Sequence, residues 1–223
     1  FLLNGELTQC RAVAEQLSGL ADQSGEAALV VSAAAMAGIC ALLAGRFADA
    51  ERELERALAL SEPGLQNTMA LRYGLDPAAV SLAGLAWAHF FLGNTSAAMS
   101  CRDAAIKRAA EVEHPFSMAY ALGLAAYLSQ FRDEPDDTRV RADALIAFAA
   151  EHGFPYWIAW GKIVRGWALA RQGSAAEGIA EIEEGLAEYT ATGARQIVPF
   201  AQLLMADAYD VAGQRPQCLA TLG

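Results

Sequence analysis

Stretches with almost no charge alternate along the chain with stretches rich in charged residues. Residues 27–45 and 77–101 carry no formal charge, whereas residues 49–60 mix leucine and alanine with glutamate and arginine. The charged stretches place their apolar residues three and four positions apart, which is the spacing of an amphipathic helix. The uncharged stretches are typical of helices that are buried on most sides. The pattern predicts hairpins, each with a buried inner helix and a half-exposed outer helix.

Breaks that contain glycine separate the two helices of each hairpin. They fall at Gly45, Gly93, Gly173 and Gly213, and a fifth, degenerate break falls at residues 132–135. Successive breaks are 48, 39, 41 and 40 residues apart. Stacked helix hairpins repeat at intervals of this size, because a single hairpin cannot bury its apolar face alone. We therefore expect an all-α fold: a right-handed α-α superhelix of about five hairpins.

The chain is expected to form a single helical repeat domain over residues 1–223. Its hairpins cover about residues 25–61, 77–112, 115–151 and 155–192, with partial hairpins at 1–22 and 196–223. Asp76 before Pro77 predicts a capped helix start, and residues 174–177 predict a capping box led by Ser174. Because the sequence begins without Met and ends within a repeat, we expect it to be a fragment of a larger protein.

Composition and charge exclude several functional classes. Hydrophobic residues make up 55 % of the chain and charged residues 19 %, which is not the composition of a disordered segment. A formal charge of −10 argues against nucleic-acid binding. Serine, threonine, asparagine and histidine dilute the uncharged stretches, and an amphipathic helix follows each, so we expect inner helices rather than membrane insertion. We expect a cytoplasmic protein.

The residues that most often carry chemistry are scattered. Cys10, Cys40, Cys101 and Cys218 are far apart in sequence and are interpreted as buried, reduced, small apolar residues. His89 lies among aromatic residues and is interpreted as a hydrogen-bonded core histidine rather than a ligand contact. Neither the cysteines nor the histidines have the spacing of a metal site, and no nucleophile with a supporting base is evident. We expect no enzyme activity, no cofactor and no metal in this segment.

Residues 35–63 resemble a tetratricopeptide repeat. Gly38 lies in the inner helix, Gly45 and Phe47 at the turn, and Ala50 and Leu54 in the outer helix. That repeat places small residues where its helices cross and an aromatic residue just after the turn. The longer spacing in this chain implies longer helices than those of the 34-residue repeat.

A narrower set of strings covers most of the chain: residues 73–77, 114–122, 153–155, 160–161 and 165–170. Together they resemble the C-terminal tetratricopeptide-type region of bacterial adenylate/guanylate cyclase fusions. In that family a cyclase or kinase domain precedes an ATPase domain and then the repeats. The resemblance implies a regulatory, partner-sensing role without catalysis, since the sequence has no phosphate-binding loop and no cyclase aspartate pair.

The inner helices of a tetratricopeptide solenoid line its concave groove. Carried over to this chain, that phase gives the candidate groove residues Trp87, Phe90, Phe91, Leu122, Ala126, Gln130, Trp160, Ile163, Trp167 and Arg171, then Phe200, Leu203 and Asp207. Lys162 and Arg165, one helical turn apart near Trp160, are further candidates in the groove. The alternative is that the longer helices shift the phase, so that the rings pack between hairpins. Lys162 and Arg165 either bind a carboxylate or phosphate or pair with nearby acidic residues. Tyr73 and Asp76 are candidates in the long loop, where a structural role as anchor and cap is the simpler interpretation.

These observations lead to one main hypothesis and two alternatives. The main hypothesis is a non-catalytic protein-interaction and regulatory module of a larger bacterial signalling protein. Its partner is a peptide or a protein domain, which includes other domains of the same polypeptide. The alternatives are a small-molecule (metabolite) sensor with an aromatic groove, and a self-association scaffold that forms a homodimer.

Overall fold

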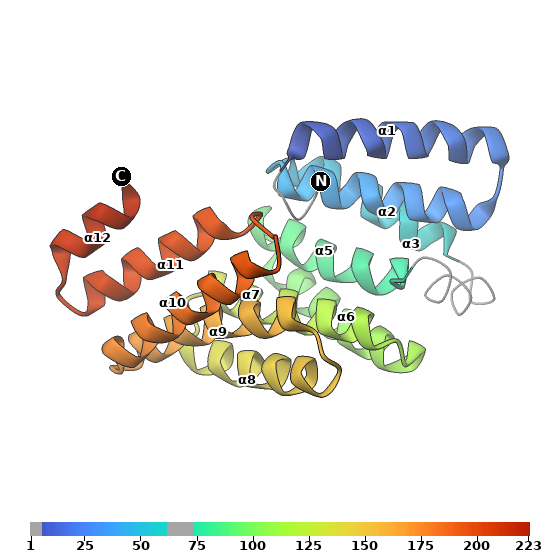
Figure 1. Ribbon diagram of the computed structural model, residues 1–223. Helices are drawn as coiled ribbons and strands as arrows, with labels where there is room; N and C mark the ends of the chain where they lie inside the picture. The colour runs from blue at the N-terminus through green and yellow to red at the C-terminus, as the bar shows by residue number, and fades with distance from the viewer. Residues whose placement is uncertain (1–5, 62–73) are drawn as a thin grey trace. The chain divides into compact units, whose positions relative to one another are not determined.

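The computed structural model describes residues 6–61 and 74–223. Within these ranges the chain forms eleven α-helices and no strand, which confirms the all-α prediction (Figure 1). The helices are α1 (Leu7–Ser24), α2 (Ala27–Leu43), α3 (Phe47–Leu60), α5 (Pro77–Phe91), α6 (Thr95–Val112), α7 (Pro115–Phe131), α8 (Pro135–Glu151), α9 (Pro155–Arg171), α10 (Ala175–Ala191), α11 (Val198–Val211) and α12 (Arg215–Leu222). None of these described helices is long and apolar enough to cross a membrane.

Residues in the left-handed conformation lie at the predicted breaks. Gly45, Gly93, Gly173 and Gly213 have φ angles of 72°, 86°, 96° and 72°. Asp133 has a φ of 57° at the fifth break. Glycine adopts this conformation without a steric penalty, and aspartate is among the few other residues that tolerate it. All five breaks are therefore confirmed, each between two helices of a hairpin.

The described residues form two compact units: residues 6–61 with 74–124, and residues 125–223. Helix α7 begins in the first unit and ends in the second. In the first unit, α2 packs against α1, α3 and α5. In the second unit, α9 packs against α8, α10 and α11. In the first unit α5 likewise packs against three helices, α2, α3 and α6. Inner helices that contact three neighbours therefore form the centre of each unit.

Leu54 of α3 is the central side chain of the first unit and is fully buried. It fits against Gly38 of α2 and Gly84 of α5. A Cβ atom on Gly38 would lie 2.5 Å from Leu54 Cγ, and one on Gly84 would lie 2.8 Å from Leu54 Cδ1. The two glycines therefore create the space that Leu54 fills, and burial of a leucine side chain contributes roughly 1.5–3 kcal/mol.

The backbones of α9 and α10 approach closely where they cross in the second unit. A Cβ atom on Gly166 of α9 would lie 2.6 Å from the carbonyl oxygen of Gly178 on α10. Ile163 and Ile182, one from each helix, are fully buried near this crossing. Small residues at the crossing therefore allow the two helices to pack at short range.

Both helix starts predicted from the sequence are confirmed, but only one of the two predicted capping hydrogen bonds is present. Asp76 precedes α5 in an extended conformation with ψ of 114°, and its side chain accepts a hydrogen bond from the backbone of Ala79. Ser174 does precede α10, but its side chain makes no capping hydrogen bond. Its ψ of 50° departs from the extended conformation in which a capping hydroxyl reaches the free N–H groups.

Candidate functional site

The aromatic candidates of α5 connect this helix to its neighbours in the first unit. The indole Nε1 of Trp87 donates a hydrogen bond to the carbonyl oxygen of Leu124 on α7, at 3.0 Å. Phe91 stacks on Phe47 of α3 with ring centroids 4.5 Å apart, and Phe90 meets Phe91 edge-on at 5.4 Å. These rings therefore hold helices together, and their predicted role in a groove stays a prediction.

Asp76, the loop candidate, is fully buried and has three partners. Its carboxylate accepts from the backbone N–H of Ala79 at 3.0 Å and from Nε of Arg108 at 2.9 Å. Its own N–H donates to Ser117 Oγ at 2.9 Å. This set of contacts fixes the start of α5. The other loop candidate, Tyr73, lies outside the described residues.

A cluster of aromatic rings joins three inner helices in the second unit. Tyr127 of α7 contacts Trp160 of α9 with centroids 4.4 Å apart, and Phe200 of α11 at 4.8 Å. Phe131 lies against the same Phe200 at 5.4 Å. Only 3 % of Trp160 is exposed. Trp160 therefore packs between helices, the arrangement that the alternative interpretation of the sequence described.

Helix α7 contributes its rings to this cluster from positions next to the groove candidates of the same helix. The sequence placed Ala126 and Gln130 on the groove side, which stays a prediction, whereas the rings of the cluster come from Tyr127 and Phe131. Sequence reasoning missed both rings. The available signal was two aromatic residues four positions apart, a spacing that puts them on one face of a helix.

Lys162 and Arg165 of α9 form ion pairs with the acidic face of α10. Lys162 Nζ donates to Glu184 at 2.8 Å and to Glu188 at 2.7 Å. Burial lowers the pKa of Lys162, but the hydrogen bonds to the two carboxylates outweigh this effect, so the pKa lies above its ordinary value. Arg165 pairs with Glu181. Both cations are therefore engaged within the second unit.

Asp207 of α11 joins the polar ends of two other candidates. It accepts a hydrogen bond from Trp167 Nε1 at 2.7 Å and lies 3.5 Å from Arg171 Nη1. Arg171 also donates to Asp133 at 3.0 Å, and its guanidinium lies 5.7 Å from the centroid of the Trp167 ring. The structure thus brings Trp167, Arg171 and Asp207 into direct contact.

The groove candidate Gln130 of α7 differs from these residues. Its Oε1 atom is buried without a hydrogen-bond partner among the described residues.

One face of α11 combines fixed and accessible side chains. We define the α11 stripe as Phe200, Leu203, Asp207 and Val211, which are three or four positions apart and therefore lie on one face of the helix. Phe200 and Asp207 are held by the contacts described above. Leu203 is 55 % exposed and Val211 45 % exposed. The stripe presents accessible apolar surface beside a carboxylate of fixed position.

Comparisons with known proteins agree with this architecture. The family model described as Tetratricopeptide repeat matches residues 31–56. BtubC (BKLC) from P. vanneervenii is similar in structure, with a TM-score of 0.63 and 14 % identity, over 97 % of this chain and 87 % of that chain. A chain from Podosopora anserina, named for kinesin light chain and its nearly identical TPR-like repeats, has a TM-score of 0.54 and 18 % identity, over 86 % of this chain and 91 % of that chain. No curated protein matches this sequence.

These findings define the class of the fold. The chain is an all-helical, tetratricopeptide-like repeat protein. The sequence match lies on α2 and α3, the hairpin whose Gly38 and Leu54 form the close helix contact of the first unit.

Proposed function

We propose that this chain is a non-catalytic protein-interaction module that binds a peptide segment of its partner along the α11 stripe. The observation that carries the proposal is the exposure of Leu203, 55 %, between two residues that are fixed by contacts. Exposed apolar surface beside ordered polar groups is typical of protein-binding sites. Because Phe200 and Asp207 are already held in place, binding requires little ordering of the stripe.

The charges around the stripe favour a partner segment that combines apolar and basic side chains. Leu203 and Val211 offer apolar contact, and Asp207 and the exposed Asp210 lie on the same side of the helix. The whole chain carries a formal charge of −10. An acidic surface attracts a basic segment and raises its association rate.

The resemblance to cyclase fusions supports a more specific role. We propose that the module belongs to a larger bacterial signalling protein and acts in the cytoplasm beside that protein's catalytic and ATPase domains. A peptide that binds one state of the parent more tightly would shift the parent toward that state. The tetratricopeptide-like fold and the absence of catalytic motifs from the sequence are consistent with this assignment.

The test selects peptides from a random phage-displayed library against the chain and measures the affinity of the selected peptides by fluorescence anisotropy. Leu203→Asp is expected to weaken binding at least about tenfold, because it places a charge in the apolar contact. Val140→Asp is the matched control, since Val140 of α8 is 63 % exposed and lies outside the stripe. This control variant is expected to bind like the unmodified chain.

Two results would overturn the proposal. If Leu203→Asp and Val140→Asp bind the selected peptides equally well, the stripe is not the binding surface. If the mass of the unmodified chain in sedimentation rises with protein concentration, while the Leu203→Asp variant keeps the mass of a monomer, the stripe is a self-association surface instead.

A second candidate function rests on a cavity of about 190 Å³ in the first unit. Its described lining is apolar and includes Met36 and Ile39 of α2, Val80 of α5 and Tyr120 of α7. A small apolar metabolite fits such a lining. Displacement of an apolar fluorescent probe would detect the metabolite. Ser32 of α2 also lines the cavity, so Ser32→Leu, which reduces the cavity volume, is expected to abolish probe binding.

A further inference from the structure

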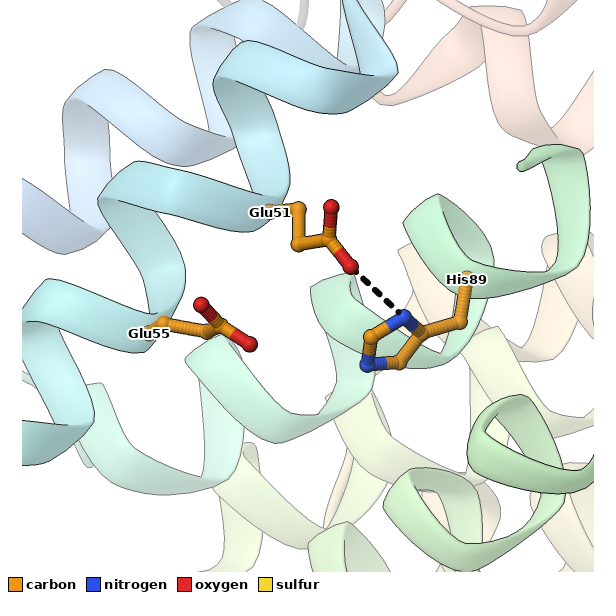
Figure 2. A group of neighbouring side chains, drawn as sticks. All are labelled: Glu51, Glu55 and His89. Carbon is orange, nitrogen blue, oxygen red and sulfur yellow. Dashed lines mark ion pairs between the residues drawn. The ribbon is translucent and has the colours of Figure 1, made fainter. Parts of the chain in front are cut away.

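Three side chains that commonly bind metal ions meet between α3 and α5 in the first unit. Glu51 and Glu55 lie one turn apart on α3, and His89 faces them from α5 (Figure 2). One ligand atom from each residue lies within 4.8 Å of the other two. His89 Nδ1 and Glu51 Oε1 are 3.1 Å apart. The three residues come from two different hairpins, so their proximity is produced by the packing of the helices.

Within residues 6–61 and 74–223, no lysine or arginine forms an ion pair with either glutamate. The two arginines of α3 pair with Asp49 and Glu53 instead. Among the described ion pairs, His89 is the single partner of Glu51, and none includes Glu55. Like charges four positions apart destabilise a helix, and the Glu51 side chain is only 29 % exposed. A bound cation would offset this repulsion.

A hydrogen bond between His89 and Glu51 does not account for their approach. Nδ1 of His89 is buried and has no hydrogen-bond partner in the described part of the chain, although Glu51 Oε1 is 3.1 Å away. The distance is suitable but the direction is not. Two atoms that each bind one tetrahedral zinc ion at about 2.0–2.1 Å lie roughly 3.3 Å apart. The spacing of this pair is thus close to that of two ligands directed at one ion.

We propose that Glu51, Glu55 and His89 form a binding site for one Zn²⁺ ion. An imidazole nitrogen and two carboxylates suit zinc, whereas Mg²⁺ and Ca²⁺ prefer sites made of oxygen alone. Three protein ligands leave the fourth position to water. Glu55 is exposed, so its side chain can rotate to close the site. The ion would link α3 to α5 and stabilise the first unit, a role separate from peptide binding on α11.

The first experiment titrates the metal-free chain with Zn²⁺ in a calorimeter. We expect one zinc per chain and a rise in melting temperature, because a ligand that binds only the folded state stabilises it. The same concentration of Mg²⁺ is expected to leave the melting temperature unchanged. Co²⁺ in place of Zn²⁺ is expected to give the visible absorption of a tetrahedral site with nitrogen and oxygen ligands.

The variants Glu55→Gln and His89→Gln test the ligands. Each is expected to weaken zinc binding at least about tenfold, since loss of an outer-shell partner alone costs 10–100-fold. Glu53→Gln is the matched control, because Glu53 lies on the same helix and pairs with arginine. Glu55 is exposed, so its variant is expected to keep the circular dichroism of the unmodified chain.

Three results would overturn the proposal: no stoichiometric zinc binding, zinc binding retained by both variants, or a Co²⁺ spectrum with intense thiolate charge-transfer bands. The last would place the ion on a cysteine, and Cys101 is a candidate because it packs against the cluster of buried residues that contains Leu54. None of these results bears on peptide binding by the α11 stripe.

Discussion

Two guanidinium nitrogens of Arg108 on α6 contact the carboxylate of Asp76, the buried residue that precedes α5. Nε lies 2.9 Å from Oδ2, and Nη2 lies 3.3 Å from Oδ1. The same carboxylate caps α5 through the N–H of Ala79. A two-point contact between guanidinium and carboxylate is stronger and more directional than a single hydrogen bond. The pair therefore ties the first turn of the inner helix to its outer partner.

Arg108→Ala is expected to destabilise the first unit by about 3 kcal/mol, because it leaves the Asp76 charge buried without its counter-ion. Urea unfolding followed by circular dichroism measures this loss. Lys107→Ala is the control, since the Lys107 side chain is 79 % exposed and its pairing with Glu111 is long, at 3.9 Å. The control is expected to change stability by less than about 0.5 kcal/mol. Equal losses of unfolding free energy in the two variants would show that the buried Arg108–Asp76 pair stabilises the unit no more than an exposed ion pair does.

Gly178→Ala is expected to destabilise the second unit by several kcal/mol, because the new methyl group would collide with the carbonyl oxygen of Gly166. Gly19→Ala is the opposite case. Gly19 lies inside α1, and a Cβ atom there would meet nothing within 4 Å. This variant is expected to stabilise its helix by up to about 1 kcal/mol. Thermal unfolding of both variants checks the sign of each change, and a stable Gly178→Ala would contradict the close crossing of α9 and α10.

The features that the sequence predicts well are local. The glycine breaks and the Asp76–Pro77 helix start depend on residues close together in the chain, and the structure has both. The face that each long helix presents is less predictable, because one added residue rotates a side chain by about 100° around the helix axis. The sequence reasoning accordingly named Ala126 and Gln130 on α7 and did not name the rings at Tyr127 and Phe131, one position further along. The meeting of Glu51 with His89 depends on how hairpins stack, for which a single sequence has no signal.

Oxidation is expected to join Cys10 of α1 to Cys40 of α2. Their Sγ atoms are 2.7 Å apart, and both side chains are buried. Burial, together with the neighbouring Cys10, raises the pKa of the Cys40 thiol to about 12, so little thiolate exists at neutral pH and the reaction is slow there. Oxidised glutathione would accept the two electrons and two protons of the thiols and leave as two molecules of glutathione.

Peptide mapping under non-reducing conditions detects the Cys10–Cys40 cross-link and its faster formation at higher pH. Cys10→Ser is expected to abolish it. Cys101 and Cys218 serve as internal controls, since neither lies in the pair. If prolonged incubation with oxidised glutathione leaves Cys10 and Cys40 unlinked, or links either to another cysteine, the contact between α1 and α2 is not as described.

Alkaline pH is expected to destabilise the second unit through its buried tyrosines. Burial is the main cause that raises the pKa of Tyr127 well above its ordinary value, and the nearby Tyr189 adds a smaller effect in the same direction. Burial also raises the pKa of Tyr189. Both therefore stay protonated in the folded chain above about pH 10, where tyrosines of the unfolded chain lose their protons. Stability is then constant below about pH 10 and falls above it by up to about 1.4 kcal/mol per pH unit for each such tyrosine. Urea unfolding over this pH range measures the slope of the free energy of unfolding against pH. Tyr127→Phe is expected to make this slope less steep by the contribution of one titrating tyrosine. An unchanged slope would contradict the burial of Tyr127.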